Sequence, residues 1–401
     1  MIRGWRLAFA AASLVLGLTG CWDRTEVNDL AFVMAMAIDK AGAHAIEVSA
    51  QIFIPRSSGG GGGGGGGEMQ AGQGAGGSTL VRSATGSSIG DALGKLQEQI
   101  PRTLFLGHDE VYILGEQVAR GGITDHVDFL ARSSEPRKRA YVFISTSKGK
   151  EMLMNQPRLE RSSAEVVREM AELKTGMSVT IKDLELQLSG QSGTAVLPLL
   201  QKLPPESAKS DQSTIHYIRG VALIKKGKLV GTMDDSLTRG VLWIRNELDT
   251  ANITFPAGGK DGGTASVRSI KNNVKLIPEI QNGQMIMNVV LKAETYLIQN
   301  TSKMNPMNPK FNQQLESQLN LTLEKRIRQT LHAAQQKWNT DIFGFADAIH
   351  RKYPGEWRKM KEQWDEIFPK LQVAIHAQAE IQRSGSIGGS TAVPSSEVIN
   401  P

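Results

Sequence analysis

Apolar and polar residues alternate along several stretches of the chain, which is the pattern of a half-buried β-strand. In the last of these stretches every second residue from Leu371 to Ile381 is apolar. The pattern predicts strands over 30–39, 45–54, 109–114, 140–145, 215–224, 229–233, 264–276, 285–298 and 371–381. Turn residues at 225–228 and at Asn282-Gly283 predict two hairpins between neighbouring strands.

Other stretches repeat their apolar residues every three or four positions, which is the spacing of an amphipathic helix. They predict helices over 87–100, 116–132, 152–174, 179–188, 309–338, 341–352 and 355–367, with a break at Gly121-Gly122. In the long helix 309–338, apolar residues recur at every fourth position from Phe311 to Leu331, so their stripe turns by about 40° per step. We therefore expect neighbouring elements to cover this helix on more than one side.

The order of these elements predicts the fold class. Strands and helices do not alternate in regular βαβ units, which favours a multi-domain α+β fold with mixed sheets and packed helices. The 401 residues are enough for two or three domains. Pro198, Pro204, Pro205 and the polar stretch 206–213 indicate a boundary between an N-terminal domain over 21–205 and a C-terminal domain over 214–383. Residues 384–401 are rich in Ser, Gly and Pro, and we expect a disordered tail there.

The first twenty residues have the features of a secretory signal and are not expected to belong to the fold. Two arginines flank the start of a segment that is apolar from Leu7 to Leu18, too short to span a bilayer comfortably. Leu18-Thr19-Gly20-Cys21 follows, which resembles the lipobox of bacterial lipoproteins. Cys21 is the only cysteine and stands at the one position where a thiol can take up diacylglycerol. We predict that Cys21 becomes the acylated N-terminus and anchors the protein to a membrane; a secretory signal that merely contains a cysteine is the alternative.

A glycine-rich tract over 57–78 interrupts the N-terminal domain. Gly59 to Gly67 is an unbroken run of nine glycines. Polyglycine has too much backbone entropy to order itself, so the tract predicts a flexible insertion. A phosphate-binding loop would need a Gly-Lys-Ser/Thr ending and a strand-to-helix setting, and the tract has neither.

Charge and cysteine content exclude several classes of protein. The 46 basic and 40 acidic residues leave a weak positive charge of +6, spread along the chain, which does not indicate nucleic-acid binding. A single cysteine excludes an intrachain disulfide and a zinc site built on thiolates. The seven histidines include no pair at the spacing of a helical metal site, and we predict neither a metal nor a cofactor. The lysines at 225, 226 and 228 are expected to form a solvated turn.

One motif suggests catalysis. Gly86-Ser87-Ser88-Ile89-Gly90 matches the nucleophile elbow of hydrolases, but no buried strand ends directly before it. Ser88 is better interpreted as a helix cap, with Asp91 in the first turn. We find no acid–base pair and no nucleophile with partners, so the residues predict a binding or assembly protein and not an enzyme. The apolar residues of the last helices are predicted to close the core of the C-terminal domain: Phe343, Phe345, Ile349, Trp357, Trp364 and Phe368.

Several strings resemble the Ger(x)C family, the lipoprotein C subunits of spore nutrient germinant receptors. The strings are Cys21–Leu30, His108–Glu116, Ala119–Ile123, Gly240–Trp243, Asp341–Phe345, Tyr353-Pro354 and Trp364–Pro369. They follow one another over nearly the whole mature chain, and together they are specific. The glycine tract is longer than the family leads us to expect, which concerns only the geometry of that loop.

The resemblance implies a three-domain mixed α/β lipoprotein of an endospore-forming bacterium, on the outer surface of the spore inner membrane. It implies two integral-membrane partners, a ligand-sensing A subunit and a transporter-like B subunit. Three domains would divide the N-terminal domain near 151–161. The family offers no catalytic residue to carry over, and only Cys21 transfers, as the acylation site.

Two other functions are weighed against this one. A solute-binding lipoprotein of an importer would need two doubly wound lobes hinged around a cleft. A membrane-tethered hydrolase would need an exposed Ser88 with a histidine nearby.

Overall fold

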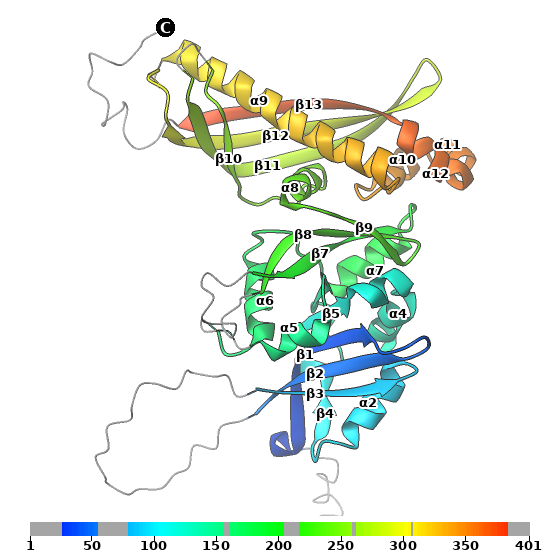
Figure 1. Ribbon diagram of the computed structural model, residues 1–401. Helices are drawn as coiled ribbons and strands as arrows, with labels where there is room; N and C mark the ends of the chain where they lie inside the picture. Colours follow the sequence, from blue (N-terminus) through cyan, green and yellow to red (C-terminus); the bar gives the residue numbers. More distant parts are fainter. Residues whose placement is uncertain are drawn as a thin grey trace, which may run out of the picture.

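The structure is a computed structural model that describes residues 26–54, 79–155, 157, 160–203, 216–258, 262–305 and 308–383. In this part of the chain nine strands form one sheet and four form another, and helices pack on both (Figure 1). This arrangement confirms the predicted α+β class with mixed sheets. Cys21, the glycine tract and the C-terminal tail lie outside the described residues.

The first sheet has the order β3-β2-β1-β5-β6-β7-β8-β9, with β4 paired to the start of β1. Its strands are β1 (Leu30–Lys40), β2 (Ile46–Phe53), β3 (Thr79–Gly86), β4 (Thr103–Phe105), β5 (Val111–Gly115), β6 (Tyr141–Ser145), β7 (Thr194–Lys202), β8 (His216–Lys225) and β9 (Lys228–Met233). β1, β5, β6 and β7 run parallel, and antiparallel strands extend the sheet on both sides. A register shift between Val33 and Ala35 lets the first residues of β1 pair with β4 and the later ones with β2 and β5.

Helices cover both faces of the first sheet. α3 (Glu116–Gly121), α4 (Thr124–Arg132) and α7 (Ile181–Ser189) contribute to the core on one face, and α5 (Gly149–Met154) and α6 (Ser163–Glu172) to the core on the other. Successive residues of β1 alternate between the two cores, because neighbouring side chains of a strand point to opposite faces. α2 (Ile89–Gln97) packs on β2 and β3, and the short 3-10 helices η1 (Val27–Asp29) and η2 (Leu106–His108) flank the β1–β4 pair.

The second sheet curls around one long helix. It contains β10 (Asn252–Pro256), β11 (Thr264–Gln281), β12 (Gln284–Asn300) and β13 (Gln372–Arg383), and α8 (Asp235–Ile244) joins it to the first sheet. α9 (Pro309–His332) contacts both outer strands of this sheet, β10 and β13. Its Asn320 and Glu316 accept hydrogen bonds from the edge amides of Ala379 and Ile381 at 2.7 and 2.8 Å. Side chains of α9 therefore satisfy two amides on the outer edge of β13.

The apolar stripe of α9 is buried along its whole length, as its spacing predicts. The six residues are Phe311, Leu315, Leu319, Leu323, Ile327 and Leu331. α8, β10 and β13 each contact the helix, which confirms that it is covered on more than one side. α9 ends in one turn of π-helix, η4 (Ala333–Lys337), before the chain turns at Asn339 with a φ of 45°.

The segment after α9 folds into short helices against both sheets. These are α10 (Phe345–Lys352), α11 (Pro354–Met360), η5 (Lys361–Gln363), α12 (Trp364–Ile367) and η6 (Phe368–Lys370). The six apolar residues predicted to close the core here are all buried. The predicted role of these residues in closing the core is therefore confirmed.

Some elements differ from the prediction. The hairpin β8–β9, expected at the start of the second domain, is hydrogen-bonded to β7 and continues the first sheet. The alternation does not predict β7, which contains Pro198, one of the prolines that indicate the boundary. Pro198 sits at a register shift between β7 and β8, where a strand tolerates proline. A fully buried strand shows no alternation, which hides it from a periodicity search. The pattern also misses β3, β4, α8 and β10. β3 ends at Gly86, directly before the Ser87-Ser88 turn, but it is a partly buried edge strand and not the buried strand of a nucleophile elbow. α5 ends at Met154 and α6 begins at Ser163, where one helix is expected.

Candidate functional site

The predicted site residues give a first test of the chemistry. Cys21 lies outside the described residues, five positions before Glu26, where the described chain begins. Ser88 is the N-cap of α2, and its hydroxyl accepts a hydrogen bond from the Asp91 amide at 3.2 Å. Its capping role is therefore confirmed. Among the residues that the structure describes, no cluster of His, Cys, Asp and Glu side chains could hold a metal ion.

Three strings of the family resemblance, Asp341–Phe345, Tyr353-Pro354 and the start of Trp364–Pro369, lie where the two sheets join. We call this region the joint. It consists of the β8–β9 hairpin tip (225–231), the loop before β7 (190–194), and the segment 338–365 that follows α9. Figure 1 shows the end of α9 and the short helices after it beside the β8–β9 end of the first sheet.

Two lysines of the hairpin tip hold one carboxylate of the joint. The Nζ atoms of Lys225 and Lys226 each lie 2.9 Å from an oxygen of Asp365, and Lys225 also donates to the backbone oxygen of Asn339. Partial burial alone would raise the pKa of Asp365, but the two ammonium groups outweigh that effect and lower it. The Lys225 side chain is only 17% exposed, so the expectation of a solvated turn is wrong for this residue. Spacing along the chain could not show that the turn packs against a segment about 140 residues away.

The loop before β7 makes the second set of contacts. Thr194 and Ser192 donate from their hydroxyls to the backbone oxygen of Asp341. The amide of Gln191 donates to Asp347 at 3.0 Å, and its side-chain oxygen accepts from the indole of Trp357 at 2.8 Å. Polar groups of one sheet thus satisfy the backbone and side chains of the other segment, which fixes their relative position.

Asp341 organises the start of α10. Its carboxylate, 3% exposed, accepts hydrogen bonds from the amides of Phe343, Gly344, Phe345 and Ala346 at 2.8–3.3 Å. Burial raises the pKa of this carboxyl, and the amides of Ala346, Phe345 and Phe343 oppose that effect. The motif Asp341–Phe345 therefore has a local structural role, because the Asp341 carboxylate accepts hydrogen bonds from the free amides of the helix N-terminus.

Below these polar contacts lies an aromatic core. Trp357 and Trp364 meet edge to face with ring centroids 5.2 Å apart, and Phe368 lies 5.8 Å from Trp364. Trp338 covers the backbone of β9 so closely that a Cβ at Gly231 would lie 2.0 Å from its indole nitrogen. The tryptophans of the joint are packing residues, as their helical spacing predicted.

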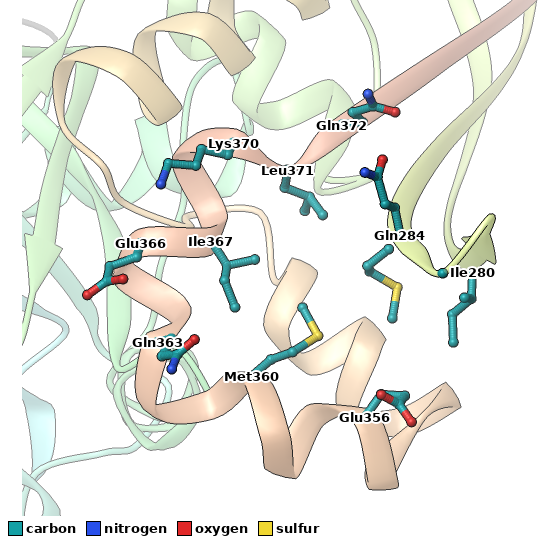
Figure 2. A pocket seen from close by; sticks show the side chains of 12 residues that line it. Ile280, Gln284, Glu356, Met360, Gln363, Glu366, Ile367, Lys370, Leu371 and Gln372 are labelled. Carbon is teal, nitrogen blue, oxygen red and sulfur yellow. The ribbon is translucent and has the colours of Figure 1, made fainter.

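An open groove of about 830 Å³ runs beside the joint, between the β11–β12 turn and α11–α12. Figure 2 shows Met360, Ile367 and Leu371 pointing into it, whereas Glu366 points outward. Lys352 donates to the backbone oxygen of Pro278 at 2.8 Å and ties the hairpin to the helices. An apolar floor with a polar rim can contact another molecule, but it contains no pair of groups arranged for acid–base or nucleophilic chemistry.

A second hollow, of about 140 Å³, lies at the carboxyl ends of β1, β5 and β6, where α/β sheets commonly bind ligands. In this protein the carboxylate of Asp39 occupies the position that a bound anion would take. Asp39, 2% exposed, accepts from the amides of Gly149 and Lys150 at the start of α5, at 2.8 and 2.9 Å. Burial raises its pKa despite these bonds. A Cβ at Gly115 would lie 2.2 Å from this carboxylate, so glycine is required there.

The fold and the joint together define a multi-domain α+β protein in which the segment after α9 packs the two sheets together. Models of two germination domains match the chain: the spore germination protein N-terminal domain over 23–202, and the C-terminal domain described as spore germination B3/GerAC like over 219–385. The chain belongs to the Ger(x)C family of spore germination proteins. The resemblance found in the sequence is thereby confirmed.

Individual relatives match over nearly their full length. The chain is 29% identical to the putative spore germination protein YfkR of Bacillus subtilis, with 92% of this chain and 94% of that protein covered. It is 28% identical to the spore germination protein KC of the same organism, with 96% and 97% covered. The crystal structure of the GerBC protein matches with a TM-score of 0.53 and 18% identity, covering 90% of this chain and all of that one, which supports the fold.

No helix in the described part of the chain combines the length and the apolar character needed to cross a bilayer.

Proposed function

We propose that this protein is the lipoprotein subunit of a spore germinant receptor and is needed for nutrient-triggered germination. The observation that carries the proposal is the match to germination proteins over both halves of the chain and nearly their whole length. In this proposal the subunit acts by assembly and not by catalysis. The joint supports that role, because its buried polar groups serve to hold the two sheets together.

The anchor of this subunit is Cys21. Acylation there would hold the chain on the outer surface of the spore inner membrane, since each buried methylene contributes about 0.8 kcal/mol to membrane binding. The partners in this proposal are two integral-membrane proteins, the A and B subunits of the receptor. The domain division at 205–214 is also part of the proposal. β8 and β9 follow that boundary but pair with the first sheet, so the two domains would share this sheet.

Purification of the tagged protein from spore membranes tests the assembly. We expect the two integral-membrane subunits to co-purify with the tagged chain, and spores that lack it to lose their response to nutrient. Cys21→Ala is the matched control for the anchor: it should take up no azido fatty acid and leave the membrane fraction. A mutant that keeps the label would overturn the assignment of Cys21, and a tagged chain that purifies alone from intact membranes would overturn the assembly.

A further inference from the structure

The β1–β4 pair has one covered and one open face. Leu30–Phe32 of β1 pair in parallel with β4. Ala31, Val33 and Leu106 pack into a small core with α2 and β2, and Leu104 lies against it. The alternate residues Phe32 and Phe105 point the other way, and neither belongs to a core cluster of the described residues.

Three rings form a cluster on the open face, which we call the aromatic patch: Phe32, Phe105 and His108. The rings of Phe32 and Phe105 meet edge to face at 5.7 Å, and the ring of His108 lies 5.3 Å from Phe32. Phe32 and Phe105 are half-buried, and His108 is exposed. The Phe105 ring lies so close to Gly107 that a Cβ there would be 2.4 Å from it, so the ring is held in place. Val27, which directly precedes this strand pair, is 69% exposed.

The position of the patch along the chain limits what can cover it. Glu26 is five positions after Cys21, and five steps of extended chain span at most about 18 Å. Acyl chains on Cys21 would therefore bring the η1 and β4 end of the molecule to the lipid headgroups. In Figure 1 this end is the one farthest from the second sheet and α9.

We propose that the aromatic patch is a membrane-contacting surface that rests on the headgroup region of the bilayer. This inference rests on the proposed lipid attachment at Cys21. Apolar rings on the surface of an anchored domain gain by entering the interface, as the apolar residues of membrane-surface helices do. The charges nearby are mainly acidic, because Glu26, Asp29 and Glu135 accompany Arg102, and Glu135 accepts a hydrogen bond from the Leu106 amide. Contact with lipid should therefore be apolar in character and persist on zwitterionic vesicles and at high salt.

The sole cysteine makes a direct test possible. A full-length mature chain, residues 21–401, is coupled through the Cys21 thiol to a maleimide lipid in phosphatidylcholine vesicles. A Trp22→Phe background removes the tryptophan next to the anchor. Phe105→Trp then places a fluorophore in the patch, and brominated acyl chains serve as quenchers. We expect a loss of Phe105→Trp emission on brominated vesicles beyond that of the background protein.

Two further variants keep the result interpretable. Leu321→Trp, at a 57% exposed position on α9, is the control at the far end and should show no loss. Val27→Trp repeats the measurement beside the patch without altering its rings. Equal losses of emission from the patch variants and from the control would overturn the proposal. Hydrogen exchange gives a second readout: protection of the patch only in membranes that contain the partner subunits would overturn the proposal as well. Because the maleimide supplies the anchor, this outcome is independent of whether Cys21 is acylated in the cell.

Discussion

At the scale of single residues, the most unusual group is Asp109, in one of the strings that carry the family resemblance. Its carboxyl is fully buried, and its Oδ1 accepts from the Val111 amide at 3.3 Å. Its Oδ2 and the hydroxyl of Tyr112 make no hydrogen bond of normal geometry within the described residues. Burial raises the pKa of Asp109 well above its usual range, and the Val111 amide and the nearby Tyr112 hydroxyl oppose that effect. The carboxyl is thus a group that the folded chain prefers to keep protonated.

This preference predicts how stability depends on pH. Because the folded pKa lies above the unfolded one, the folded state binds more protons, and stability falls as pH rises above about 4, the usual pKa of an aspartate. Asp109→Asn removes the titration and keeps the shape. Urea unfolding should show the variant gaining stability relative to the parent between pH 4 and pH 7, whereas Asp29→Asn, at an exposed site, should not. A constant difference across that range would show that Asp109 does not titrate as described.

Trp364 tests the packing interpretation of the last helices. It is 6% exposed and contacts both Trp357 and Phe368. Trp364→Ala should lower the free energy of unfolding by about 3–5 kcal/mol through the cavity it leaves. In spores, the variant should lower the amount of protein and, through that loss, the response to nutrient. If it accumulated normally, unfolded at the parent temperature and failed only in germination, the side chain would have a functional role instead.

At the scale of elements, the joint offers a comparison between two lysines that share one partner. Lys225 and Lys226 both bind Asp365, but their side chains are 17% and 76% exposed. Lys225→Ala should cost about 1–2 kcal/mol, because it also leaves the Asn339 oxygen without its donor. Lys226→Ala should leave stability unchanged within error, since a solvated pair contributes little. Equal losses in thermal unfolding of the two variants would contradict this account of the joint.

Comparison of the elements with the sequence shows which signals are local. The alternation over 371–381 and the Asn282-Gly283 turn predicted β13 and the β11–β12 hairpin, because strand faces and turn backbone are set by neighbouring residues. β7 was not predicted, because its pairing with β6 and β8 depends on residues far away in the sequence. The partners of Lys225 and Asp341 could not be predicted for the same reason. The assignment of Cys21 depends on a local processing motif and stays a prediction, because the residue lies outside the described part of the chain.

At the scale of the whole molecule, the glycine tract connects two strands that are already adjacent. Phe53 at the end of β2 and Thr79 at the start of β3 are directly paired. A short turn can therefore replace residues 57–78 without moving either strand. Because loop closure depends only weakly on length, this replacement should leave the melting temperature nearly unchanged. A loss of several degrees in calorimetry would show that the tract is ordered against the fold.

The helix side chains along the edge of β13 have a consequence for copies that share a membrane. Confinement to a surface concentrates neighbouring molecules, and a free strand edge then invites pairing between them. Asn320 and Glu316 already occupy the amides of Ala379 and Ile381, so these two donors are not available to a neighbour. Copies that the proposed lipid anchor holds on one membrane therefore cannot pair through these two amides.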